Sequence, residues 1–386
     1  MQKTNKLIAI MTLSMFLLSY MALTPIVANI YNSFPKSSLE EIQIIVTLIP
    51  LFSVLTMFLC DPLSKKISMK TIGIIGLSLI TLGGAITYIF HTYIWQIYLS
   101  SILLGLGIGL VNVISSTMIS YYFKGADKIK VMGYQSIFVS IGGTLFSYFS
   151  GLLAKINWTY SYLIFFSALI VIVLNIYMLP NDKLQSIKQK TKEKLPKRIY
   201  WLGFISILFF ISINVFNTSI ALLLEQIGYK SDTSGLVTAI YTLIGMIAGL
   251  LLNKLVKITK TNTLTISCLI ASIGFFLITS KQIVLIFIGS ALLGYAFATR
   301  NPAGITFSAN MVTPEKSALA IAIFNGCGQL GCFLSPYVIN YISKMYNSSI
   351  ATTFMVSGIF MLVVTIIHFI TNPVHKEDIL WLLKVK

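Results

Sequence analysis

Twelve runs of mainly apolar residues follow one another along this chain of 386 residues, and short polar segments separate them. A helix needs about 20 mainly apolar residues to cross a bilayer. Charged residues make up only 10% of the chain, whereas soluble proteins carry about 25%. The pattern therefore predicts an all-α integral membrane protein with twelve transmembrane helices. The predicted spans are residues 7–30, 41–60, 71–90, 94–122, 131–154, 160–180, 200–224, 233–256, 263–280, 283–308, 317–343 and 350–371.

The basic residues indicate which side of the membrane each loop faces. Lysine and arginine gather at both termini and in every second loop, whereas the intervening loops carry few of them. Because cytoplasmic loops hold the excess of these residues, we expect both termini in the cytoplasm and the protein in the cytoplasmic (plasma) membrane. The net charge of +17 would suggest nucleic acid in a soluble protein. Here the lysines form no basic helix face, so no nucleic-acid partner is expected.

An internal repeat relates the two halves of the chain. Residues 97–112, in the fourth span, align with residues 286–301, in the tenth. The coinciding pairs are Ile97/Ile286, Ser101/Ser290, Leu103/Leu292, Leu104/Leu293, Gly105/Gly294 and Asn112/Asn301. A basic stretch at 181–199 divides the chain into six spans and six. These features predict two pseudo-symmetric six-helix bundles at 1–180 and 200–371, a cytoplasmic linker at 181–199 and a tail at 372–386, with a substrate site between the bundles.

Several motifs resemble those of the major facilitator superfamily, over nearly the whole chain. The loop after the second span resembles the family's signature there, in Pro62, Leu63, Ser64, Lys66 and Lys70. It departs from that signature at Asp61, Lys65 and Ser68. Further resemblances are Trp158, Gly228-Tyr229, Ser234-Gly235-Leu236, and Pro314 to Ala318 leading to Leu334-Ser335-Pro336.

The resemblance implies a secondary transporter that works by alternating access, and the closest branch is bacterial drug efflux. Two hallmarks of that branch's proton antiporters are missing, because the fourth-span arginine falls at Ser101 and the fifth-span glycine motif keeps only Gly151. In the family the loop after the second span latches the two halves. That role would fall to Asp61, Lys65, Lys66 and Lys70.

Arg300 is the most distinctive single residue, because it lies inside the tenth span and a cation in hydrocarbon is costly without a partner or a cavity. One interpretation is that Arg300 faces a central cavity and binds an anionic group of the substrate. The other is that it extends to the headgroups near the cytoplasmic end of the helix.

Intramembrane amides are further candidates for substrate binding: Asn301, Asn112, Asn214 and Asn217. The family resemblance implies that spans one, four, seven and ten line the cavity. Asn214 and Asn217 are three residues apart and share a helix face. The alternative for each amide is a hydrogen bond between helices.

A proton-coupled carrier needs a group that titrates as its environment changes. Glu225, at the outer end of the seventh span, and His368, deep in the twelfth, are the candidates. A solvated loop carboxylate and a structural histidine are the alternatives.

These observations predict a carrier, without cofactor, metal or enzymatic activity, that exports a small amphipathic or drug-like compound. Its partners would be a small-molecule substrate, a possible proton or ion gradient and membrane lipids, and we expect a monomer. Uptake or exchange of a small organic anion bound by Arg300 is the alternative. A non-transporting sensor or lipid-handling protein on the same fold is the second.

Overall fold

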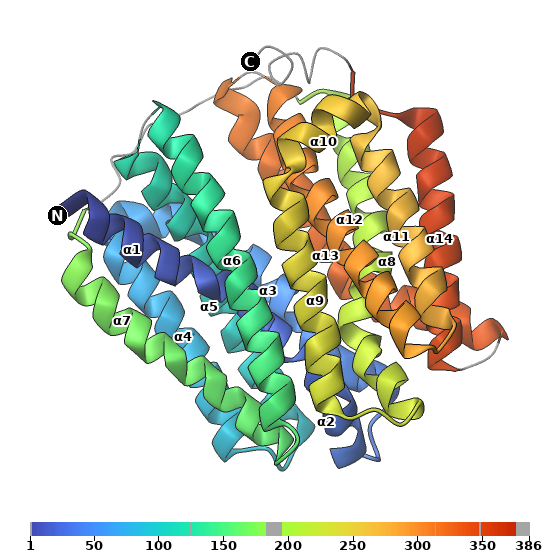
Figure 1. The fold of residues 1–386 in the computed structure, drawn as a ribbon. Coiled ribbons are helices and arrows are strands. Elements are labelled where there is room, and N and C mark those ends of the chain that lie inside the picture. Colours follow the sequence, from blue (N-terminus) through green and yellow to red (C-terminus); the bar gives the residue numbers. More distant parts are fainter. Residues whose placement is uncertain (1, 124, 183–194, 313, 347–348, 376–386) are drawn as a thin grey trace. The chain divides into compact units, whose positions relative to one another are not determined.

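The computed structural model describes residues 2–123, 125–182, 195–312, 314–346 and 349–375, and helices make up most of them (Figure 1). Twelve helical segments in this part of the chain are long and apolar enough to cross a membrane, which confirms the predicted all-helical fold with twelve spans. The first, sixth and ninth of these spans each contain more than one helical element.

The chain packs as two compact units, and each crosses the predicted domain boundary. The first unit holds Met1–Ile187 and Thr218–Thr242, and the second holds Lys188–Asn217 and Leu243–Lys386. The long helix α8 (Lys197–Gln226) therefore contributes its first part to the second unit and its last part to the first. Most of the predicted linker, residues 183–194, lies outside the described residues.

The first six spans consist of the following elements: α1 (Gln2–Ser14), η1 (Met15–Ala22), η2 (Thr24–Ile26), α2 (Val27–Ser33), α3 (Leu39–Lys66), α4 (Met69–Ile89), α5 (Ile94–Tyr122), α6 (Gly125–Leu153), η3 (Trp158–Phe166) and α7 (Ser167–Met178). After α8 come α9 (Ser231–Leu250), α10 (Leu252–Thr259), η4 (Lys260–Asn262), α11 (Thr263–Thr279), α12 (Ile283–Asn310), α13 (Pro314–Tyr346) and α14 (Ile350–Thr371).

Serine caps mark where several spans begin. Ser38 accepts a hydrogen bond from the backbone N–H of Glu41, and the Glu41 carboxylate accepts one from the N–H of Ser38, which forms a complete capping box for α3. Ser68 and Ser349 cap α4 and α14 in the same way through one hydrogen bond each. Such caps satisfy backbone donors that the first turn of a helix leaves unpaired.

The first span is not the continuous α-helix that its sequence predicts. It passes through η1 and η2, and Leu18 has non-helical dihedral angles of φ −109° and ψ 19°. Carbonyl groups freed by such a break need other donors inside a membrane. A serine of α6 supplies one, because Ser150 Oγ donates to the carbonyl of Ala22 (2.5 Å). The hydroxyl of Ser147 lies 3.4 Å from the carbonyl of Met21 but donates over a shorter distance to that of Gly143 (2.8 Å).

The repeat predicted between the fourth and tenth spans has a counterpart in the packing of each unit. In the first unit Leu104 of α5 packs against Gly83 of α4, and in the second Leu293 of α12 packs against Gly274 of α11. A Cβ atom at Gly83 would lie 3.0 Å from Leu104 Cγ, and one at Gly274 would lie 3.2 Å from Leu293 Cγ. The two equivalent leucines therefore each pack into the space that a glycine leaves on the neighbouring helix.

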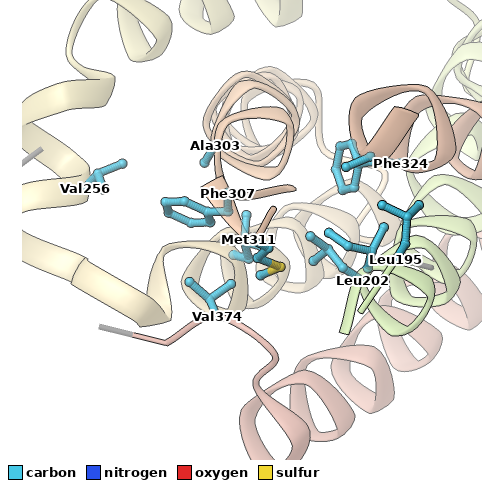
Figure 2. Packing of buried hydrophobic residues seen from close by; sticks show 11 residues of the cluster. Leu195, Leu202, Val256, Ala303, Phe307, Met311, Phe324 and Val374 are labelled. Atoms are coloured by element: carbon cyan, nitrogen blue, oxygen red, sulfur yellow. The ribbon is translucent and has the colours of Figure 1, made fainter. Parts of the chain in front are cut away.

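A cluster of buried apolar side chains closes one end of the second unit (Figure 2). Phe307 and Met311 of α12 pack there with residues from the start of α8, from α10 and α13, and from the segment after α14. Its members are Leu195, Ile199, Leu202, Val256, Leu264, Ala303, Phe307, Met311, Ala320, Phe324 and Val374. The cluster fixes the segment after α14, at Val374, against the start of α8.

Candidate functional site

Arg300 lies inside the second unit, where its side chain is only 1% exposed. Helix α12 carries it, and helix α8 supplies its nearest polar and aromatic contacts. Its Nη2 donates to the backbone carbonyl of Ile205 over 3.3 Å, and its Cζ lies 4.5 Å from the ring centroid of Phe209. The guanidinium is thus covered by protein and does not extend to the surface.

The guanidinium is only partly satisfied by its surroundings. Within the part of the chain that the structure describes, Nε and Nη1 of Arg300 have no hydrogen-bond partner. The thiol of Cys268 on α11 is its closest side-chain neighbour with polar character, and His368 on α14 lies within electrostatic range. A buried cation without a paired anion is destabilising, so this site favours an anion whenever one can reach it.

His368 takes part in the same interior region. Its side chain is fully buried, and its Nδ1 lies 2.7 Å from Oγ1 of Thr265 on α11. Its Nε2 has no partner among the described residues. The hydrogen bond joins α14 to α11, which is the structural role given above as the alternative to proton coupling.

The amides of α8 connect neighbouring side chains and helices. Asn214 Nδ2 donates to the carbonyl of Cys332 on α13 (3.0 Å), and Asn217 Nδ2 donates to Oδ1 of Asn214 (3.2 Å). Asn214 and Asn217 therefore share a helix face, as their spacing predicts, and Asn217 Oδ1 is buried without a partner among the described residues. Asn112 on α5 and Asn301 on α12 are half-buried.

Polar contacts join the last part of α8 and the first part of α9 to earlier spans within the first unit. We call these contacts the α8–α9 contact zone. Gln43 of α3 donates to Ser219 of α8 (2.9 Å), and Asn32 of α2 donates to Glu225 (2.6 Å). The hydroxyls of Thr144 on α6 and Thr242 on α9 lie 2.8 Å apart.

Charge and close packing complete the contact zone. Lys155, after α6, forms a 2.6 Å ion pair with Asp232 of α9. Gly151 and Gly235 bring α6 and α9 together, since a Cβ at Gly151 would lie 2.6 Å from the carbonyl oxygen of Ser231. This contact gives a physical reason for the one glycine that the fifth span keeps.

Of the polar residues in the α8–α9 contact zone, sequence reasoning singled out Glu225 but not the others. Gln43 carried a usable signal, because it is an amide inside an apolar span. Lys155 and Asp232 carried none, since charges at the ends of spans are ordinarily solvated.

The predicted latch lies where α3 gives way to α4. The side chains of Asp61 and Lys65 fall outside the described residues. Lys66 is exposed at the end of α3, and Lys70 Nζ donates to the carbonyl of Ile176 on α7 (2.5 Å). The backbone N–H of Met69 donates to the carbonyl of Asp182 (3.0 Å), which fixes the start of the linker segment to this turn.

Comparison with protein-family models matches the chain in two successive halves. Residues 7–204 and 202–380 each match the Major Facilitator Superfamily. No curated protein sequence is similar enough to count as a match.

Solved structures resemble the chain along nearly its whole length. The nucleoside transporter NupG is similar with a TM-score of 0.79 at 16% identity, over 96% of this chain and 99% of that one. The POT family transporter PepTSo is similar with a TM-score of 0.76 at 12% identity, over 96% and 97%. The D-xylose-proton symporter gives 0.75 at 14% identity, over 96% and 98%. At these identities the likeness shows the fold alone.

Proposed function

The chain belongs to the major facilitator superfamily of secondary transporters, and from this premise we propose that it exports a small amphipathic or drug-like compound by alternating access. The α8–α9 contact zone carries the proposal. Its hydrogen bonds, single ion pair and glycine contact are individually weak. Helices held by several such contacts can separate and reassociate without exposing a large apolar surface.

The polar groups inside the described spans also support this class of substrate. They are mainly hydroxyls and amides, and the described carboxylates lie at or near the ends of helices. Such groups suit a compound that is apolar over most of its surface and needs a few hydrogen bonds. The export direction follows from the resemblance to the drug-efflux branch.

A second candidate is uptake or exchange of a small organic anion, and Arg300 favours it. Two of its nitrogen atoms, Nε and Nη1, lack partners among the described residues. A carboxylate could accept a hydrogen bond from either of them. Because the guanidinium is covered, this candidate requires a second conformation that opens a path to it.

We further propose that both termini are cytoplasmic and that Asp61, Lys65, Lys66 and Lys70 latch the two halves in one state of the cycle. The distribution of basic residues supports the orientation, and the resemblance of the loop supports the latch. Glu225 and His368 remain the candidates for proton coupling, Asn112, Asn301, Asn214 and Asn217 for substrate contacts. The working unit is proposed to be a monomer.

Purified protein in proteoliposomes can test the choice between substrates. Labelled anions and cationic dyes would be supplied in turn, with and without a pH gradient. Dye extrusion that an uncoupler abolishes supports export, whereas anion exchange without a gradient supports the second candidate. Movement of no solute would contradict both and favour a sensor or lipid-handling protein.

A cross-link can test the contact zone itself. The pair Thr144→Cys and Thr242→Cys would form a disulfide across hydroxyl positions that are now 2.8 Å apart. Oxidation should stop transport and a reducing agent should restore it, while each single variant stays active under oxidation. Transport that continues in the fully cross-linked protein would show that α6 and α9 need not separate.

A further inference from the structure

A groove of about 530 Å³ opens between the start of α8 and the segment that follows α14. It lies in the second unit and is separate from Arg300, from the amides of α8 and from the α8–α9 contact zone. The lining residues are Lys197, Arg198, Tyr200, Trp201, Thr371, Asn372, Pro373 and His375.

The walls of the groove are fixed by contacts between its two sides. Arg198 Nε donates to the carbonyl of Pro373 (2.8 Å), and Trp201 Nε1 donates to Oγ1 of Thr371 (2.9 Å). Asn372 Nδ2 donates to the carbonyl of Thr261 (3.0 Å), which ties the same segment to η4. Beneath it Val374 is buried in the apolar cluster of the second unit (Figure 2). The groove is therefore formed before any ligand arrives.

Basic residues line the groove on both sides. Lys197 and Arg198 belong to α8 and His375 to the segment after α14, and none of the lining residues named above is acidic. Lysine and arginine side chains are the usual ligands of phosphate oxygens. The groove is suited to a phosphate group.

Exposed apolar side chains continue from the groove along both helices. On α8 these are Tyr200, Trp201 and Phe204, and the rings of Trp201 and Phe204 stack with centroids 5.4 Å apart. On α14 they are Ile366, Phe369 and Ile370. Tryptophan and tyrosine mark the depth of the headgroups in membrane proteins, so a phosphate in the groove would lie at that depth with apolar surface beside it.

We propose that this groove binds the phosphate headgroup of an anionic phospholipid, whose acyl chains lie against the exposed apolar faces of α8 and α14. The ligand is a phosphodiester that carries two hydrocarbon chains, and a soluble phosphate would match only the basic part of the surface. Basic pockets at the ends of spanning helices are suited to such headgroups. The site would anchor the beginning of the seventh span to the end of the twelfth in the leaflet where the basic loops lie.

Quenching of Trp201 fluorescence provides a local test. The chain has four tryptophans, so Trp95, Trp158 and Trp381 would be changed to phenylalanine to leave Trp201 as the reporter. This protein would be reconstituted in phosphatidylcholine vesicles that contain increasing amounts of brominated phosphatidylglycerol. A parallel series would use brominated phosphatidylcholine, and a third would add inorganic phosphate to vesicles that contain brominated phosphatidylglycerol.

The expected result is selective quenching by the anionic lipid at low mole fraction. In the double variant Lys197→Gln and Arg198→Gln the apparent affinity should fall roughly tenfold to thirtyfold, from the loss of two basic residues beside an anionic surface. The matched double variant Lys130→Gln and Lys254→Gln also removes two charges from exposed lysines, and it should bind as the parent does. Millimolar phosphate should not displace the lipid.

Three outcomes would overturn the proposal. They are equal quenching by both brominated lipids, unchanged affinity in the Lys197 and Arg198 variant, and displacement by free phosphate, which would indicate a soluble anion as the ligand. If the double variant does not fold, the single variant Lys197→Gln serves instead, because Arg198 then keeps its hydrogen bond to Pro373. That variant should still bind the anionic lipid several-fold more weakly than the parent.

Discussion

The fourth and tenth spans occupy equivalent places in the repeat, yet they differ in charge at one pair of equivalent buried positions. Val111 of α5 is the counterpart of Arg300 of α12, and both are buried. Val111 packs against Gly76 of α4, where an added Cβ would lie 2.9 Å from Val111 Cγ2.

The corresponding part of the second unit is polar. Ser267 Oγ of α11 lies 2.8 Å from Thr299 Oγ1 of α12, and the neighbouring Cys268 and Arg300 face each other. The glycine and leucine contacts thus keep the same helix packing in both units, between α4 and α5 and between α11 and α12. The side chains where these helices cross have diverged, and of the two buried positions compared, only that in the second unit carries a cation.

The largest effect is expected from placing a cation in the first unit, in the variant Val111→Arg. An arginine is too large for the space that Val111 fills beside Gly76 and would bring a cation into that apolar contact, so folding should lose more than about 3 kcal/mol. Fluorescence-detected size exclusion after extraction in mild detergent would measure the loss of folded protein. Val111→Met is the apolar control, and a stable Val111→Arg protein would show that the two crossings tolerate charge equally.

Enlarging a glycine should have a similar cost in both units. A Cβ at Gly107 would lie 2.5 Å from the carbonyl oxygen of Gly76, and one at Gly289 would lie 2.6 Å from that of Gly274. Gly107→Val and Gly289→Val should each destabilise the protein by about 1–3 kcal/mol, because the helices must move apart. Thermal unfolding would compare them with Gly133→Val, since no atom lies within 4 Å of a Cβ there. If only one of the two variants lowers the melting temperature, the helices of the other unit can move apart at little cost.

Arg300→Met separates stability from transport. Replacing a buried cation that lacks an anionic partner with an apolar side chain of similar length should leave the melting temperature unchanged or raise it. If the anion candidate is right, uptake of the anionic substrate should fall by about tenfold or more, a loss of at least about 1.4 kcal/mol in binding. Arg300→Lys keeps the charge and should retain part of the activity. Normal kinetics for every substrate in Arg300→Ala would exclude a role in binding.

The smallest effect is expected from Ser267→Ala, which removes the hydrogen bond to Thr299. Hydrogen bonds between membrane helices contribute about 0.6 kcal/mol on average, so the melting temperature should fall slightly and transport should persist. Ser100→Ala is the control in the first unit, where Ser100 Oγ donates to the carbonyl of Gly83 (2.6 Å). A much larger loss at Ser267 would mean that its hydroxyl also supports Arg300.

The sequence predicted the twelve spans because the thickness of a bilayer demands long apolar runs, whatever their packing. It also predicted the equivalence of Leu104 and Leu293, since each packs against a glycine of the neighbouring helix in its own unit. It identified Arg300 by its charge, but not the ring of Phe209 or the thiol of Cys268 beside it. Those residues belong to other spans, and composition does not determine how each helix is rotated.

The break at Leu18 in the first span was not predictable either. Residues Met15–Ala22 are as apolar as those of a regular spanning helix, and the hydroxyl group that donates to the carbonyl of Ala22 lies on α6. Likewise, the pairing of Lys155 with Asp232 depends on how two helix ends meet. Local sequence carries no information on such a meeting.

The broken first span has a mechanical consequence. A 3₁₀-helix rises about 2.0 Å per residue, whereas an α-helix rises about 1.5 Å. Conversion of the eight residues of η1 to α-helix would therefore shorten the span by about 4 Å and rotate everything beyond it. Ser150 holds the end of this segment through the carbonyl of Ala22. The length of the first span therefore depends on whether these residues keep the 3₁₀ form, and a hydroxyl group of a neighbouring helix supports that form.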